Sequence, residues 1–170
     1  MLIALTGTPG TGKTTVSALL PYPVVDVNAL VKGGLCIRSD PDRGCLEADM
    51  EGLADKVREM DGPGPVVLEG HISHHLADLA VVLRLHPSQL RSRLSARGYP
   101  PAKVNENILA EALDVILVEA VERCDRVWEI DTTGLSPSQV AGRIQDAVEG
   151  REQFPPRGMN WLGEIEIDLG

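Results

Sequence analysis

The most specific chemical pattern lies near the start of the chain, in the stretch GTPGTGKT at positions 7–14. Two of its glycines are separated by four residues and are followed by Lys13 and Thr14. Glycine reaches backbone angles that turn N–H groups inward around a phosphate at a helix N-terminus. Lys13 would then reach the outer phosphates of a nucleoside triphosphate, and the Thr14 hydroxyl would bind Mg²⁺. A glycine-rich turn with an incidental lysine is the plainer alternative, and the apolar run at 2–5 directly before the stretch disfavours it.

A second candidate group follows the apolar run at 66–68, which ends in Glu69 and is followed two residues later by His71. In an open parallel sheet, ligands bind beyond the carboxyl ends of the strands, so both side chains are expected beside the phosphate-binding loop. There Glu69 would hold Mg²⁺ directly or through a water molecule, and His71 would orient a water molecule or a phosphate. The alternatives are an acid at the edge of the core that backbone groups satisfy, and a purely structural histidine.

Arginines form a third group, with Arg91, Arg93 and Arg97 close together and a GYPP segment directly after the last of them. Arginine gives fixed, bidentate stabilisation to the charge that develops in phosphoryl transfer, and the GYPP segment would let Arg97 arrive on a moving lid. Surface salt bridges to Glu106 and Glu111 are the alternative.

Two further sets of side chains have less specific patterns. Arg38 and Arg43 lie in a predicted loop at 33–45, where they could hold a second phosphate. His74 and His75, with the histidine at 71, form an HxxHH cluster that could bind a metal if it were helical. Roles facing solvent or capping a helix are the expected ones for these two histidines.

The remaining pattern alternates short apolar runs with stretches of helical period, which predicts βαβ units and an α/β fold with a parallel sheet. After residue 150 the pattern is irregular. Gly163–Gly170 is expected to be an edge strand or a mobile tail, and Trp161 to dock on the body or to pack at the surface. The predicted strands are 2–5, 24–27, 66–69, 79–85 and 126–130, and the predicted helices are 13–20, 29–32, 45–60, 88–96, 103–123 and 137–148.

Composition narrows the class of protein. At 170 residues the chain is long enough for one domain with a single core and too short for two substantial ones. Its net charge of −9 disfavours autonomous nucleic-acid binding and favours a basic protein partner. Three cysteines without CxxC spacing indicate reduced thiols, and no apolar stretch reaches the roughly 18 residues of a membrane span. We therefore expect a cytoplasmic protein without a membrane segment.

Several of these stretches together carry a family resemblance. GTPGTGKTT, the EGH at 69–71, VVLRLHPSQLRSRLSARGY at 81–99 and KVNENILAE at 103–111 occur in order and with compatible spacing. In these features the chain is similar to the adenylate kinase isoenzyme 6 family, also called coilin-interacting nuclear ATPases. The family usually has Asp where this chain has Glu69. The absence of a lysine-rich tail and the arginine-rich composition suggest an archaeal member.

The resemblance implies a P-loop nucleoside monophosphate kinase fold with a five-stranded parallel sheet of order 2-3-1-4-5 and helices on both faces. It implies a kinase domain over residues 1–150, with an NMP-binding insert near 28–50 and a lid near 96–106, followed by a C-terminal tail at 151–170. By the same resemblance, Arg97 contacts ATP from the lid. The other residues that would bind ATP lie in the loop, and they are Gly10, Thr11, Gly12, Lys13, Thr14 and Thr15.

Three functions remain as hypotheses. The first is an ATP:AMP phosphotransferase with ATPase activity, in which ATP and Mg²⁺ are bound by the loop, the acceptor AMP by Arg38 or Arg43, and catalysis involves Lys13, His71 and Arg97. Family members also aid maturation of the small ribosomal subunit. The second is therefore an assembly factor whose nucleotide cycle controls its grip on a basic ribosomal protein. The third is a small-metabolite kinase on the same fold.

Overall fold

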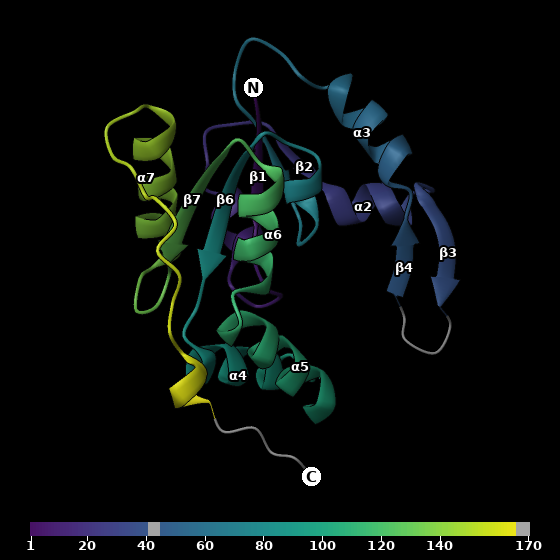
Figure 1. Cartoon of the computed structure of the whole chain (residues 1–170). Coiled ribbons are helices and arrows are strands. Elements are labelled where there is room, and N and C mark those ends of the chain that lie inside the picture. Colours follow the sequence, from purple (N-terminus) through teal and green to yellow (C-terminus); the bar gives the residue numbers. More distant parts are fainter. Residues whose placement is uncertain (41–44, 166–170) are drawn as a thin grey trace.

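The computed structural model describes residues 1–40 and 45–165. Its main element is a five-stranded parallel sheet in which the strands lie in the order β2-β5-β1-β6-β7. When these five strands are numbered by themselves along the chain, the order is 2-3-1-4-5. The predicted α/β fold with helices on both faces of a parallel sheet is therefore confirmed (Figure 1). The strands are β1 (Leu2–Thr6), β2 (Val24–Asp26), β5 (Val66–Glu69), β6 (Leu79–Arg84) and β7 (Arg126–Asp131).

The core lies on both faces of this sheet because successive strand residues point to opposite sides. Ile3 and Leu5 of β1 pack in one cluster with α1 and α7, whereas Ala4 packs in another with α6. The first helix ends three residues before its predicted end, and the last agrees with its predicted bounds. These covering helices are α1 (Lys13–Ser17), α6 (Val115–Arg123) and α7 (Pro137–Val148).

An antiparallel hairpin of β3 and β4 occupies the region for which the sequence predicts a loop at 33–45 (Figure 1). Arg38 on one strand lies opposite Glu47 on the other, and unlike charges directly across a ladder favour the pairing. The predicted helix at 45–60 is consequently wrong in its first turn, since a helix begins only after Asp49, whose side chain caps it. The elements of this region are α2 (Val27–Lys32), β3 (Cys36–Asp40), β4 (Cys45–Ala48) and α3 (Met50–Arg58).

The helix predicted at 103–123 is two helices in the structure, because the chain turns between α5 and α6. At the turn Asp114 has φ 56°, the one non-glycine residue with positive φ in the described part of the chain. Its carboxylate accepts a hydrogen bond from buried Arg84 at 2.5 Å, which favours this left-handed conformation. In residues 1–40 and 45–165, no helix has the length and apolar character needed to cross a bilayer. The two helices beyond the carboxyl end of the sheet are α4 (Pro87–Ala96) and α5 (Pro101–Ala112).

The segment after α7 returns along the edge strand β7 (Figure 1). The backbone N–H of Glu129 donates to the carbonyl of Phe154 at 2.8 Å, and Trp161 is only 8% exposed. Of the two alternatives for Trp161, the structure therefore favours docking on the body over packing at the surface. Leu162–Glu164 forms a short 3-10 turn, and the end of the predicted strand or tail at 166–170 lies outside the described residues.

Candidate functional site

The loop between β1 and α1 has the backbone conformation that its glycines predict. Gly7, Gly10 and Gly12 have φ of 138°, 98° and 103°, which L side chains rarely adopt. At Gly7 an added Cβ would also lie 2.5 Å from the carbonyl oxygen of Leu83, so glycine is needed there for space as well. The loop therefore turns over the carboxyl end of β1 and leads directly into the N-terminus of α1.

Lys13 folds back over its own loop. Its Nζ donates to the carbonyl oxygens of Gly7 at 2.7 Å and Thr8 at 3.1 Å, and the side chain is 8% exposed. Burial lowers the pKa of Lys13 to about 8, against the opposing effect of the Glu69 and Glu111 carboxylates. The ammonium group thus occupies the centre of the loop, where its donors can transfer from carbonyl oxygens to phosphate oxygens.

Side chains from distant elements brace this loop from behind. The Thr8 hydroxyl donates to the buried carboxylate of Glu111 on α5, and the Thr11 hydroxyl donates to the Thr8 carbonyl at 2.9 Å. Arg93 on α4 donates to the Gly10 carbonyl at 3.2 Å. Arg93 therefore supports the loop, rather than forming the surface salt bridge that was its alternative.

A cleft of about 610 Å³ opens in front of the loop and brings together most of the predicted site residues. It joins the loop, β5, α4 and α5, which lie far apart in the chain, as expected where ligands bind beyond the carboxyl ends of parallel strands. The lining residues are Pro9, Gly10, Gly12, Lys13, Thr14, Thr15, Asn28, Lys32, Glu69, His71, Arg97, Tyr99, Lys103, Glu106 and Asn107.

Glu69 lies at the end of β5 beside the loop and is 5% exposed, and Thr14 lines the same cleft. Burial raises the pKa of Glu69, the charge of Lys13 opposes this, and the charge of Asp26 adds to it. A carboxylate and a hydroxyl side by side are the oxygen donors that Mg²⁺ prefers. Glu69 and Thr14 can therefore hold a divalent cation between them and a phosphate.

His71 lies at the mouth of the same cleft with an exposed side chain. Partial burial and the charges of Lys13 and Lys103 lower the pKa of His71, so its imidazole is neutral near pH 7. A neutral imidazole has one nitrogen free to accept a hydrogen bond, which suits a group that orients water or a hydroxyl. Its backbone carbonyl is fixed by the Thr6 hydroxyl at 3.1 Å.

The three predicted arginines take separate positions. Arg97, at the end of α4, is exposed and lines the cleft. It also lines an adjoining pocket of about 180 Å³ between the loop and α7, which shares Gly12 and Thr15 with the cleft. Arg91 instead donates to Asn105 on α5 at 3.0 Å and does not line the cleft.

Of the two predicted acceptor residues, the one that the structure describes is not brought to this cleft. Arg38 lies exposed on β3 and is absent from the cleft lining, and Arg43 lies outside the described residues. The HxxHH cluster is also not helical as a unit. His74 is 1% exposed, so the expectation that it faces solvent is wrong. His74 and His75 both contact Glu119 rather than His71.

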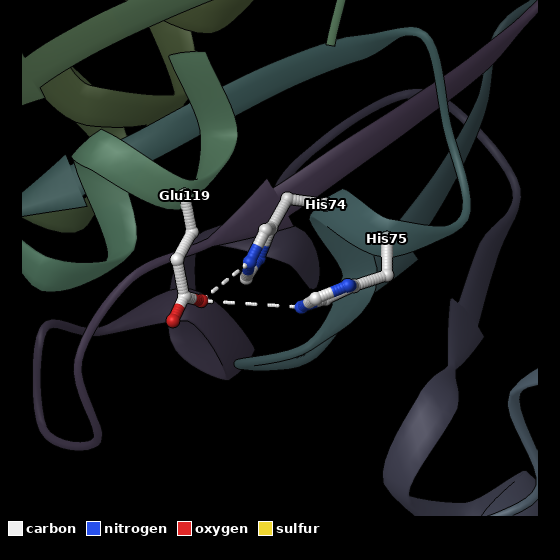
Figure 2. Close-up of side chains that lie close together, drawn as sticks. All are labelled: His74, His75 and Glu119. Carbon is white, nitrogen blue, oxygen red and sulfur yellow. Dashed lines mark hydrogen bonds and ion pairs between the residues drawn. The ribbon is translucent and has the colours of Figure 1, made fainter. Parts of the chain in front are cut away.

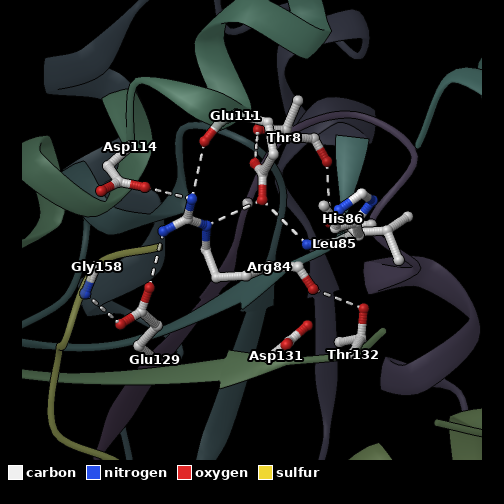
Figure 3. A network of polar contacts seen from close by, with 12 residues as sticks. Thr8, Arg84, Leu85, His86, Glu111, Asp114, Glu129, Asp131, Thr132 and Gly158 are labelled. Carbon is white, nitrogen blue, oxygen red and sulfur yellow. Dashed lines mark hydrogen bonds and ion pairs between the residues drawn. The ribbon is translucent and has the colours of Figure 1, made fainter. Parts of the chain in front are cut away.

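Sequence reasoning missed a buried charge network centred on Arg84 at the end of β6 (Figure 3). Its guanidinium contacts Glu111 at 2.9 Å, Asp114 at 2.5 Å and Glu129 at 2.8 Å. Burial disfavours its charge, and the carboxylates of Glu111 and Asp114 outweigh this and raise the pKa of Arg84. An arginine inside the apolar run VVLRL was the available signal, because a charge in a buried strand needs partners.

The network joins the phosphate-binding loop to the tail. Glu111 accepts the Thr8 hydroxyl as well as the Arg84 guanidinium, and Glu129 accepts the backbone N–H of Gly158 at 2.9 Å (Figure 3). The ring of Trp161 lies 5.2 Å from the guanidinium carbon. The alternative in which Glu111 forms a surface salt bridge with the arginines at 91–97 is therefore wrong, since Glu111 is 3% exposed and pairs with Arg84.

Comparison with known proteins identifies relatives that span the chain. A family model described as "AAA domain" matches residues 3–114. A protein of Methanothermobacter thermautotrophicus named "Putative adenylate kinase" is 46% identical over 169 residues, which cover 95% of this chain and 98% of that protein. A protein of the same name from Thermococcus onnurineus is 47% identical over 172 residues, covering 98% and 94%.

Among solved structures, shikimate kinase from Acinetobacter baumannii in complex with shikimate superposes with a TM-score of 0.60. The match covers 89% of this chain and 94% of that chain at 15% identity, and it shows a shared fold alone. The near full-length matches at more than 40% identity carry the assignment of the family. The chain belongs to the adenylate kinase-like family that these archaeal proteins represent.

Proposed function

We propose that this protein is an ATP:AMP phosphotransferase that uses Mg²⁺ and also hydrolyses ATP. The observation that carries the proposal is the cleft of about 610 Å³ in which the phosphate-binding loop, Glu69, His71 and Arg97 meet. Phosphoryl transfer needs positioning and charge stabilisation rather than a protein nucleophile, and these residue types supply both. The names of the relatives agree with this reaction.

ATP is proposed to bind with its phosphates in the loop and its base in the adjoining pocket of about 180 Å³. The two hydrogen bonds from Lys13 to its own loop would be replaced by hydrogen bonds to phosphate oxygens. The Lys13 ammonium group, whose pKa burial lowers, would then have a negatively charged partner. The loop residues proposed to contact ATP are Gly10, Thr11, Gly12, Lys13, Thr14 and Thr15.

Mg²⁺ is proposed to be held by Thr14 and Glu69. The donor set fits, because both groups present oxygen and the Glu69 carboxylate is buried beside the loop. Bound Mg²⁺ neutralises charge on the transferring phosphates. Because Glu is one methylene longer than Asp, the proposal includes contact with the metal either directly or through a water molecule.

Catalysis is proposed to depend on Lys13, Arg97 and His71. Arg97 follows α4 and precedes a glycine at φ 76°, so it can approach the phosphates when the proposed lid at 96–106 closes. The neutral His71 can accept a hydrogen bond from a water molecule at one ring nitrogen, or donate one to the acceptor phosphate from the other.

The acceptor is proposed to be AMP, bound between the cleft and an NMP-binding insert at 28–50. Asn28 and Lys32 of α2 line the cleft on that side. Arg38 and Arg43 remain the proposed phosphate ligands, and Arg38 would have to approach through movement of the β3–β4 hairpin. On this proposal residues 1–150 form the kinase domain and residues 151–170 a tail.

The test is the AMP dependence of ADP formation from ATP and Mg²⁺. We expect ADP production to rise with AMP and to saturate, with a slower rate in its absence that measures hydrolysis. The Lys13→Ala variant should lose both rates, and Lys56→Ala, an exposed lysine on α3, should keep them. ADP formation that is unaffected by AMP but fast on shikimate, gluconate or another non-nucleotide acceptor would overturn the proposal and favour a small-metabolite kinase.

A second proposed role is that of an isoenzyme 6 type assembly factor that aids maturation of the small ribosomal subunit. Its support is the net charge of −9, which favours a basic ribosomal protein as partner. We expect small-subunit ribosomal proteins to be retained by the immobilised protein in a manner that depends on ATP. Absence of binding with and without ATP would remove this role and leave the kinase proposal standing.

A further inference from the structure

A cluster of three metal-ligating side chains lies outside the nucleotide cleft. In residues 1–40 and 45–165, His74, His75 and Glu119 are the one group of His, Cys, Asp and Glu whose possible ligand atoms all lie within 4.8 Å of one another. The histidines come from the 3-10 turn η1 (Ser73–His75) and the glutamate from α6. Figure 2 shows the three side chains facing one another across the gap between these two elements.

The spacing is close to what a tetrahedral transition-metal site requires. The Oε2 atom of Glu119 lies 3.1 Å from Nε2 of His74 and 3.9 Å from Nε2 of His75. Ligands bonded to zinc at about 2.1 Å and at tetrahedral angles are about 3.4 Å apart, which lies between these two distances. His75 is 24% exposed, so the longer separation can close by a small movement of a side chain that has room to move.

The surroundings of His74 fix its ring as a metal ligand needs. Its Nδ1 lies 3.1 Å from the Thr6 hydroxyl, and that hydroxyl donates to the His71 carbonyl. Nε2 lies 3.1 Å from the Glu119 carboxylate, so a metal bound there would displace the Nε2 proton and leave Nδ1–H to donate to the Thr6 hydroxyl oxygen. A hydrogen bond from the second ring nitrogen is the usual support of a metal-bound histidine.

The electrostatic setting keeps both imidazoles available. Burial, together with the proximity of His75, lowers the pKa of His74, and burial and the charge of Arg123 lower the pKa of His75. Neutral histidines and an ionised glutamate are the forms that bind a metal. Both histidines also line a cavity of about 1060 Å³ whose wall includes Leu2 and Arg126, at the amino ends of their strands, which gives solvent access from the side opposite the nucleotide cleft.

We propose that His74, His75 and Glu119 form a binding site for one zinc ion or a similar divalent transition metal, with a fourth position open to solvent. Two imidazoles and one carboxylate are a known zinc ligand set, and they select against Mg²⁺, which prefers oxygen ligands. The site joins η1 to α6. Through His74 it also contacts Thr6, the residue that directly precedes the phosphate-binding loop. It is distinct from the proposed Mg²⁺ site at Thr14 and Glu69.

The test is a titration of chelator-treated, nucleotide-free protein with Zn²⁺ in excess Mg²⁺, read by competition with a chromophoric chelator. A Co²⁺ titration followed by visible absorption reports the ligand field directly. We expect one ion per chain.

His75→Gln and Glu119→Gln should each weaken zinc binding by about 100-fold or more, because loss of even an outer-shell partner commonly costs about 10- to 100-fold in metal affinity. Both residues are partly exposed, so these variants are expected to fold.

Two matched variants serve as controls. His86→Gln removes the histidine of another His–Glu pair, in which His86 contacts Glu164 at 2.8 Å and no third ligand lies nearby among the described residues. Glu122→Gln changes the same charge three residues along α6. Both should bind zinc as the unchanged protein does, and zinc should raise the melting temperature in both but not in Glu119→Gln. The proposal is overturned if no zinc binds at micromolar concentration, or if His75→Gln and Glu119→Gln bind it as tightly as the controls.

Discussion

At the scale of single residues, Lys13 combines burial with a charge that the fold must accommodate. Its amine is held by two carbonyl oxygens, and the Glu69 and Glu111 carboxylates favour its charged form from a distance. Burial nevertheless outweighs them, and the pKa of Lys13 falls from 10.5 to about 8. Burying the charged form of Lys13 therefore lowers the free energy of unfolding of the nucleotide-free protein, which a solvent-exposed charged lysine would not do.

This shift predicts that stability changes with pH. The unfolded chain keeps the Lys13 proton up to about pH 10.5, whereas the folded protein loses it near pH 8, so the unfolded state binds more protons between these values. The free energy of unfolding should then rise with pH, by up to about 3 kcal/mol relative to Lys13→Met over this window. Urea unfolding of both proteins at a series of pH values measures it. A difference that stays constant with pH, as expected for Lys56→Met, would contradict the prediction.

The role proposed for His71 predicts a separation of binding from turnover. His71→Ala should lower ATP hydrolysis by about 100-fold while the dissociation constant for ATP changes little, because a group that orients the attacking water acts on turnover rather than on ATP binding. Single-turnover hydrolysis and ATP titration measure the two quantities. Equal rates for the variant and the unchanged protein would show that His71 orients nothing in the reaction.

At the scale of elements, the phosphate-binding loop is a turn that only glycine allows at certain positions. Gly7→Ala should lower the free energy of unfolding by about 1 to 3 kcal/mol, because φ is 138° and the added Cβ would meet the carbonyl of Leu83. Gly142→Ala is the matched change in open space within α7 and should raise it by about 0.5 to 1 kcal/mol, since glycine lowers helix stability. Chemical denaturation compares the two. Equal effects would show that the loop relaxes around Gly7.

The sequence predicts elements well where one local pattern is unambiguous. The loop at 7–14 and the apolar runs of the sheet have this property, because glycine spacing and strand-length apolar runs need no tertiary partner to be recognised. The β3–β4 hairpin and the break before Asp114 do not. The hairpin strands are too short to show clear alternation of apolar and polar residues. At the break, the helical period of apolar residues continues through the turn, and the contact of Asp114 with Arg84 favours the positive φ of Asp114.

The candidate site divides in the same way. Glu69 and His71 are placed by the rule for parallel strands, which needs only the end of a strand, and the cleft contains both. Glu111 and Glu119 lie on helices whose register against other elements the sequence does not specify. Their partners, Arg84 and His74, could be recognised as charged or ligating residues, but not as members of a particular contact.

At the scale of the whole molecule, the Arg84 network joins three elements around one buried cation. Arg84→Met should lower the free energy of unfolding by about 3 to 5 kcal/mol, because the buried carboxylates of Glu111 and Glu129 then lose their counter-charge. Arg151→Met removes a half-exposed cation that pairs with Asp146 at the surface and should cost less than about 1 kcal/mol. Urea unfolding measures both. A loss for Arg84→Met no larger than for Arg151→Met would contradict the importance of the network.

The double role of Glu111 has a consequence for the history of the sequence. Its carboxylate accepts hydrogen bonds from both the Thr8 hydroxyl and the Arg84 guanidinium. A substitution that removes one of these three groups therefore takes a hydrogen-bond partner away from at least one of the others and is expected to lower stability. A lineage that replaces the arginine by an apolar residue must also replace the acid, and the loop threonine then loses its acceptor. The three positions, far apart in the chain, are therefore expected to change together among descendants or not at all.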